Sequence, residues 1–152
     1  MKIAQNKIVK WSIVVGWMFV IFCFSAQNAD ESSALSGGIA ALLTDLVQRI
    51  FSVDITQNAK LIFFVRKTAH FSIYFVLGLL VSGALRDETI DWKKVLTALV
   101  ICFIYACSDE FHQYFVPGRS CSFRDVCIDT CGALVGILLL KIAIQWKNGY
   151  NR

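Results

Sequence analysis

Four long apolar segments, separated by short charged stretches, constrain the fold of this chain more than any other feature. The first three are Trp11–Ala26, Phe71–Leu85 and Val95–Ser108, and the fourth ends near Trp146. Each approaches the roughly 20 helical residues that cross the hydrocarbon core of a bilayer. Hydrophobic residues make up 57% of the 152 residues, more than a soluble domain of this length readily buries. The pattern predicts an all-α integral membrane bundle of about four transmembrane helices.

The second and third apolar segments are too short to cross a bilayer unaided, with fifteen and fourteen residues. The second helix must therefore include several residues before Phe71, and the third must continue through Asp109 and Glu110. With Ile8 and Val9 added, the first segment reaches spanning length. We expect a single domain, 1–152, with spans at about 8–26, 68–86, 94–114 and 124–146.

The start of the chain allows a second interpretation, because a basic stretch followed by an apolar segment is also the pattern of a cleaved signal peptide. Lys2, Lys7 and Lys10 supply the basic stretch. The bulky Phe24 stands where a cleavage site has small residues, so we favour a retained first helix.

An amphipathic helix is expected between the first two spans, at about residues 33–52. Ser32 or Ser33 can cap it, and apolar residues then recur every three or four positions, which makes one face apolar. The apolar positions are Leu35, Ile39, Leu42, Leu43, Leu46, Val47, Ile50 and Phe51. The helix either lies in the membrane interface or packs across the end of the bundle, and both descriptions fit the same helix.

The distribution of basic residues predicts the orientation, since four spans place both termini on one side. That side carries Lys2, Lys7, Lys10, Arg86, Lys93, Lys94, Lys147 and Arg152. The other side carries Arg49, Lys60, Arg66, Lys67, Arg119 and Arg124. By the positive-inside rule, this modest bias predicts a multi-pass protein of the plasma membrane with both termini in the cytoplasm. The net charge is +4, but no basic run is interleaved with aromatics, so nucleic acid is not an expected partner.

Ionisable residues gather at the outer ends of the second, third and fourth spans. They are His70, Asp109, Glu110, His112, Arg119, Asp125 and Asp129. Charges at membrane depth are costly, so they pair with one another or face a cavity. A structural interpretation pairs Asp109 or Glu110 with Arg119, and Asp129 with Arg66 or Lys67.

The functional interpretation is a polar pocket open to the outer leaflet. A histidine oriented by a carboxylate can transfer protons near neutral pH, and Arg119 can bind a phosphate or carboxylate through its planar fork. Asp109 and Glu110 are adjacent, so they point about 100° apart on a helix. We therefore expect one of them to face the pocket while the other caps or pairs.

The segment between the third and fourth spans carries turn and helix-start signals. Val116 to Arg119 predicts a type II turn, with Pro117 and Gly118 in their preferred positions. Ser122 is expected to cap the last helix, with Asp125 completing a capping box. Further along, Asp125, Asp129, Gly132 and Gly136 share one helical face, where the glycines allow another helix to approach closely.

The six cysteines do not form a recognisable metal or disulfide framework. No CxxC pair occurs, and a zinc site from His112, Asp109 and Cys121 matches no familiar ligand spacing. Whether Cys121 and Cys127 pair on an oxidising outer face stays open. We expect no metal and no cofactor.

Three sequence blocks resemble the VanZ-like family of small membrane proteins. The first is Phe24 to Gln27, with the serine-containing stretch that follows. The second is Arg66 to Phe71 with Tyr74, Leu77 and Gly78, and the third is Asp109, Glu110 and Gln113, then Pro117 to Arg119, Asp125, Asp129 and Gly132. Thr130 and Cys131 precede Gly132, where the family often has Asn. His112 lies outside the pattern and ranks below His70.

The resemblance implies a multi-helix membrane protein related to one linked to teicoplanin resistance. The candidate catalytic residues are His70, Asp109 and Glu110. The candidate ligand-binding residues are Arg66, Lys67, Tyr74, Gln113, Arg119, Asp125 and Asp129. The expected partners are membrane lipids, with a lipid-linked cell-wall precursor or a glycopeptide as the candidate ligand.

Two further function classes remain beside this hypothesis. A non-catalytic membrane protein would bind a lipid or a drug, or support a partner protein, with the charged cluster holding the helices. A proton-coupled transporter is less favoured, because four spans leave little room for alternating access and no inverted repeat is evident. The oligomeric state is left open by the sequence.

Overall fold

A computed structural model describes residues 2–27, 34, 38, 59–86, 90–119 and 121–150. It contains the helices α1 (Lys2–Ser25), α3 (Ala59–Leu85), α4 (Trp92–Gln113) and α5 (Phe123–Tyr150), with no strand among the described residues. All four helices are long and apolar enough to cross a membrane. The expected all-α bundle of four spans is therefore confirmed. The amphipathic helix expected at 33–52 lies outside the described residues, apart from Ala34 and Gly38.

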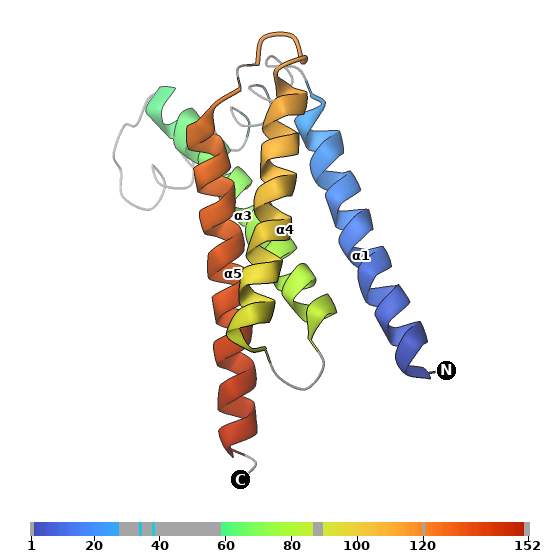
Figure 1. Ribbon diagram of the computed structural model, residues 1–152. Helices are drawn as coiled ribbons and strands as arrows, with labels where there is room; N and C mark the ends of the chain where they lie inside the picture. Colours follow the sequence, from blue (N-terminus) through green and yellow to red (C-terminus); the bar gives the residue numbers. More distant parts are fainter. Residues whose placement is uncertain are drawn as a thin grey trace.

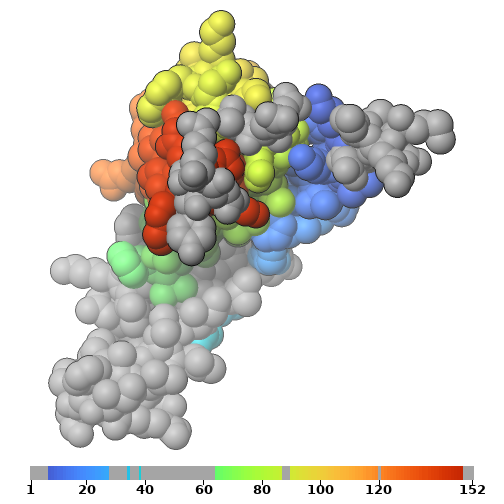
Figure 2. Space-filling view, turned by 90° about the horizontal axis from the view of Figure 1, so that it is seen from below, coloured from blue at the N-terminus to red at the C-terminus, as the bar shows by residue number. Residues whose placement is uncertain are grey.

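The helices alternate in direction along the bundle (Figure 1). α1 and α4 run towards the turn that joins α4 to α5, and α3 and α5 run back from it. Both termini and the connection between α3 and α4 therefore lie at the opposite end. Seen from that end, the start of α4 and the end of α5 lie side by side, and α1 lies at the edge of the group (Figure 2).

The helices α3 and α5 form the most extensive contact of the bundle, and glycines make it possible. A Cβ atom added at Gly78 would lie 2.2 Å from the carbonyl oxygen of Ala133, and one added at Gly136 would lie 2.3 Å from that of Phe75. No side chain fits in this space. The close approach expected from the glycine stripe is confirmed, and it places the two parallel helices backbone to backbone.

Two hydrogen bonds from aromatic side chains attach α1 to its neighbours. The indole Nε1 of Trp17 donates to the carbonyl oxygen of Ile73 in α3 at 2.9 Å. The hydroxyl of Tyr105 in α4 donates to the carbonyl oxygen of Met18 at 2.6 Å. Such a donor needs a partner when it is buried, so these bonds fix the height of α1 against the bundle.

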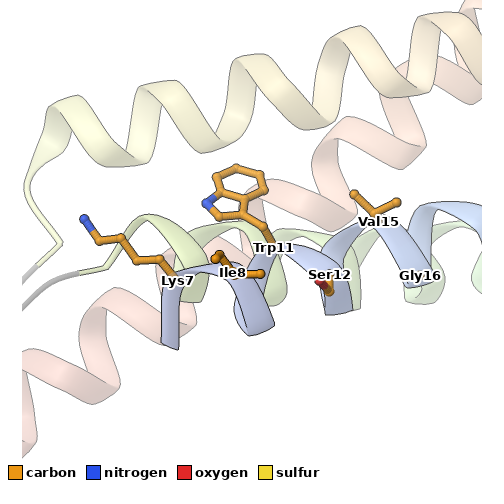
Figure 3. Close-up of a pocket in the computed structure, with 6 residues that line it drawn as sticks. All are labelled: Lys7, Ile8, Trp11, Ser12, Val15 and Gly16. Carbon is orange, nitrogen blue, oxygen red and sulfur yellow. The ribbon is translucent and has the colours of Figure 1, made fainter. Parts of the chain in front are cut away.

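A shallow groove runs along the first half of α1 (Figure 3). It is lined by Lys7, Ile8, Trp11, Ser12, Val15 and Gly16. All six residues come from one helix. The groove therefore lies on the surface of α1, in the half of the helix that is remote from the α4–α5 turn.

The α4–α5 connection has the predicted turn. The Arg119 N–H donates to the carbonyl oxygen of Val116 at 3.1 Å, and Gly118 has φ 75°. A type II turn requires positive φ at its third residue, and Pro117 suits its second. The turn reverses the chain, so that α4 and α5 pack against each other and bring their acidic residues together.

Candidate functional site

A polar cluster lies between the four helices at the end that carries the α4–α5 turn. Each helix contributes to it, and every residue named as a catalytic or ligand-binding candidate in the sequence analysis lies in it. The cluster consists of Ser25 from α1, Arg66, Lys67, His70 and Tyr74 from α3, Asp109, Glu110 and Gln113 from α4, Arg119 from the turn, and Asp125 and Asp129 from α5.

Two contacts connect α3 to α5 at successive depths. Lys67 forms an ion pair with Asp125, and both side chains are only slightly exposed. One turn further along α5, about 6 Å away, Asp129 is fully buried and its Oδ1 lies 3.6 Å from Nδ1 of His70. Lys67 thus pairs with Asp125 and not with Asp129, and the basic partner of Asp129 is the histidine.

Asp109 occupies the centre of the cluster, on the face of α4 that points towards the other helices. It is 4% exposed. Gln113, one turn later, donates to its Oδ2 at 3.4 Å. Ser25, Tyr74 and Asp129 also lie close to this carboxyl group, so Asp109 is the point at which all four helices meet.

Glu110 has a different role, which follows from its different direction on α4. It is 1% exposed, and its Oε2 accepts the Ser122 N–H at 2.8 Å. Ser122 precedes the first residue of α5, so a carboxylate from one helix caps the start of the next. The expected division of roles between Asp109 and Glu110 matches this geometry. The expected capping box is wrong, because Asp125 bonds to Lys67 and Glu110 occupies the N–H of Ser122.

Arg119 lies at the rim of the cluster, directly after the turn, and is partly buried. Burial lowers the pKa of its guanidinium below the ordinary value, and the neighbouring Arg66 lowers that pKa further. Asp109, Glu110 and Asp125 act in the opposite direction. Two arginines therefore stand near each other at the rim, where an anion would reduce their repulsion.

Several buried polar atoms of the cluster have no hydrogen-bond partner among the described residues. They are Ser25 Oγ, His70 Nδ1, Tyr74 OH, Asp109 Oδ1, Glu110 Oε1, and both Oδ atoms of Asp129. Buried polar atoms nearly always form hydrogen bonds in folded proteins, with protein, solvent or a ligand. These atoms gather in one part of the bundle, where Ser25 and Tyr74 lie beside Asp109 and His70 lies beside Asp129.

The structure leaves His112 and Arg124 outside the cluster and adds Ser25 to the candidate residues. The ring of His112 lies 4.6 Å from that of Phe22 in α1, and Arg124 is exposed. Ser25 was quoted in the first sequence block but not proposed as a site residue. The sequence gives only a weak indication of a site role for Ser25, which is a small polar residue at the end of an apolar segment. Its burial, at 3% exposure, comes from tertiary packing.

The described residues contain no group of three or more His, Cys, Asp or Glu side chains that could hold a metal ion. All six cysteines are free, including Cys121 and Cys127, which answers the open question of their pairing for this structure. What the cluster offers is oxygen acceptors in its interior and cationic donors at its rim.

Four membrane-length helices around a buried charged cluster define a multi-pass membrane protein. Residues 10–144 match the family model described as VanZ/LLP1, and this match covers most of the chain. The chain belongs to the VanZ-like family, as its sequence blocks indicated. No curated protein matches in a second comparison, and no solved structure matches in a third.

Proposed function

We propose that this VanZ-like protein binds or modifies an anionic lipid-linked or amphiphilic ligand at the polar cluster. The protein resides in the plasma membrane with both termini in the cytoplasm, so the cluster faces the outer leaflet. By family resemblance, the ligand belongs to the cell envelope, and the phenotype to examine is susceptibility to the glycopeptide teicoplanin.

One observation carries the proposal: Arg119 is partly buried at the rim, and Arg66 is near enough to lower its pKa further. Arg119 forms no ion pair within 4.0 Å among the described residues. A phosphate or carboxylate placed between the two guanidinium groups would receive paired hydrogen bonds. The apolar part of the ligand would remain in the bilayer beside the helices.

The acid–base candidates lie immediately below this rim. His70 stands 3.6 Å from Asp129, and Asp109 and Glu110 both feel its charge. A histidine held between carboxylates can donate or accept a proton near neutral pH. If the ligand is modified, His70 transfers the proton, Asp129 orients its ring, and Arg119 positions the anion.

The test compares Arg119→Ala with Arg124→Ala in a host whose teicoplanin susceptibility depends on this chain. Arg124 is exposed and serves as a matched loss of one cation near the same turn. We expect the first variant to lose the phenotype at normal expression and the second to retain it. Equal phenotypes in the two variants would count against an anion site at Arg119.

A second function is a non-catalytic membrane protein that binds a lipid or a drug or supports a partner protein. The Glu110 cap and the Lys67–Asp125 pair favour it, because both also hold helices together. Turnover separates the two functions. Purified protein incubated with envelope lipids yields a new product if it modifies them and none if it only binds or supports. A scaffold would also lose stability, and not selectivity for a ligand, when Arg119 is replaced.

A further inference from the structure

Four oxygen-bearing side chains from four different helices converge beneath the rim. They are Ser25, Tyr74, Asp109 and Asp129, which we call the inner niche. Their exposed fractions lie between 0% and 4%. Asp109 lies close to each of the other three. The niche is therefore a shared feature of the whole bundle and not of one helix face.

The two hydroxyl groups show that the niche is more than a pair of acidic residues. Ser25 Oγ and Tyr74 OH are buried beside Asp109 and lie within reach of its carboxyl group as hydrogen-bond donors. One oxygen of Asp109 and both oxygens of Asp129 have no hydrogen-bond partner among the described residues. Ionised carboxylates only accept hydrogen bonds, and each hydroxyl group has a single O–H to donate. The two hydroxyl groups therefore cannot fill all the acceptor positions of the two carboxylates, and the niche has room for further donors.

The charge of the cluster changes sign with depth. The rim carries Arg66, Lys67 and Arg119, with Asp125 as the partner of Lys67. The niche carries Asp109 and Asp129, with His70 as the nearby basic group. Along α5, the step from Asp125 at the rim to Asp129 in the niche is one turn, about 6 Å. A short linker between an anion and a cation in one head group can bridge such a step.

We propose that the inner niche receives a protonated primary amine carried by the same amphiphile whose phosphate binds at Arg119. This inference rests on the proposed function and specifies its ligand class. An ammonium group supplies three N–H donors and one positive charge, which match the acceptors and the two carboxylates of the niche. A neutral hydroxyl would add no positive charge, so the two carboxylates would have only His70 as a nearby basic group, which is costly in a buried site.

The test titrates the purified full-length protein with three phospholipids of identical acyl chains and counts bound lipid by native mass spectrometry. Phosphatidylethanolamine carries a phosphate and a primary ammonium. Phosphatidylcholine carries the same phosphate and charge without N–H donors, and phosphatidylglycerol carries the phosphate without an amine. We expect the ethanolamine lipid to bind about tenfold more tightly than the choline lipid. Equal affinity for these two lipids in the unmutated protein overturns the inference.

Two substitutions in the niche locate the preference. Asp129→Asn keeps the shape and removes a charge, and we expect the ethanolamine-to-choline ratio to fall close to one. Tyr74→Phe removes a single buried oxygen and leaves all charges in place, so it should lower the ratio less. Asp91→Asn is the control, because Asp91 is exposed at the start of α4 and Asn also caps helices well. A preference that survives both niche variants places the amine elsewhere and overturns the inference.

Arg119→Ala separates failure of this inference from failure of the proposed function. It should weaken the binding of all three lipids to a similar degree, because they share the phosphate. If phosphatidylglycerol binds Arg119→Ala and the unmutated protein equally, the anion site is wrong. A preference for ethanolamine that depends on Asp129 would still stand in that case. If Arg119→Ala weakens the binding of all three lipids, but the unmutated protein does not prefer the ethanolamine lipid, only the assignment of an amine to the inner niche is wrong.

Discussion

Gly132 of α5 packs so closely on Phe71 of α3 that a Cβ atom at position 132 would lie 2.3 Å from the Phe71 carbonyl oxygen. Gly136 makes the same contact with Phe75 one turn later. These two contacts fix the register of the parallel helices. In that register Lys67 and His70 stand opposite Asp125 and Asp129, so the glycines position the charged site.

Replacing Gly132 by Ala should destabilise the protein, because backbone atoms cannot move aside as a flexible side chain would. Overpacking costs about 1–3 kcal/mol, which exceeds the gain of up to about 1 kcal/mol in helix propensity on replacing Gly. The measurement is the midpoint of thermal unfolding in detergent. Gly83→Ala is the matched control on α3, since its nearest atom lies 3.9 Å away. A midpoint for Gly132→Ala at or above that of the control would contradict the close contact.

The sequence was sufficient to predict the four helices and the shared face of Asp125, Asp129, Gly132 and Gly136. Both follow from regularities within one helix: the length of an apolar segment, and the 3.6-residue period. The sequence did not predict which side chain each acidic residue contacts. The register between the helices depends on which backbone atoms Gly132 and Gly136 approach. These contacts join residues that are far apart in the sequence.

Glu110→Ala should destabilise the start of α5. The Ser122 N–H would lose its acceptor at 2.8 Å, and the loss of a helix cap costs about 0.5–2 kcal/mol. Glu110→Gln retains an oxygen that can accept the same bond, so it should recover most of the stability. Hydrogen exchange of the first turn of α5 measures the effect directly. Unchanged exchange in both variants would show that the cap does not support this helix end.

The cap also shows why a local motif misled the sequence analysis. Ser122 and Asp125 have the spacing of a capping box, and nothing in that segment indicates another acceptor. In the fold, Glu110 comes within reach of the Ser122 N–H because the turn at Pro117 reverses the chain. The carboxylate of Asp125 is then available to Lys67. Ser25 was missed as a site residue for a related reason, because its burial beside Asp109 depends on the packing of α1.

A double-mutant cycle should reveal coupling between Lys67 and Asp125. Lys67→Met and Asp125→Asn each leave a partly buried charge without this partner, so each single change should destabilise. The double variant should be more stable than the sum of the single effects predicts, by about 0.5–3 kcal/mol. Thermal unfolding of the four proteins gives the coupling. Strict additivity of the two effects would contradict a direct interaction between these side chains.

The proposed orientation, with both termini in the cytoplasm, predicts that Cys121 faces the outer side of the membrane. This thiol is free and exposed in the α4–α5 connection. In a variant with the other cysteines changed to Ser, a membrane-impermeant maleimide added to intact cells should label Cys121 without lysis. As the control, a cysteine introduced at exposed Lys147 should be labelled only after lysis. The reverse pattern would place the site on the cytoplasmic side.

His70 and His112 provide a matched pair for the role of the histidine in the site. His70 stands 3.6 Å from Asp129, whereas His112 contacts the ring of Phe22. If the protein modifies its ligand, His70→Gln should lower turnover by about 10²–10⁴-fold, the usual contribution of a general acid or base. His112→Gln should retain the unmutated rate.

Binding of phosphatidylglycerol to both histidine variants controls for folding, because the arginine rim remains in each. Retained binding with lost turnover in His70→Gln alone would assign proton transfer to His70. Asp129→Asn should then lower turnover less than His70→Gln, since it removes the group that orients the ring and leaves the ring in place. Equal turnover in the two histidine variants would exclude His70 as the acid or base and favour a site that only binds.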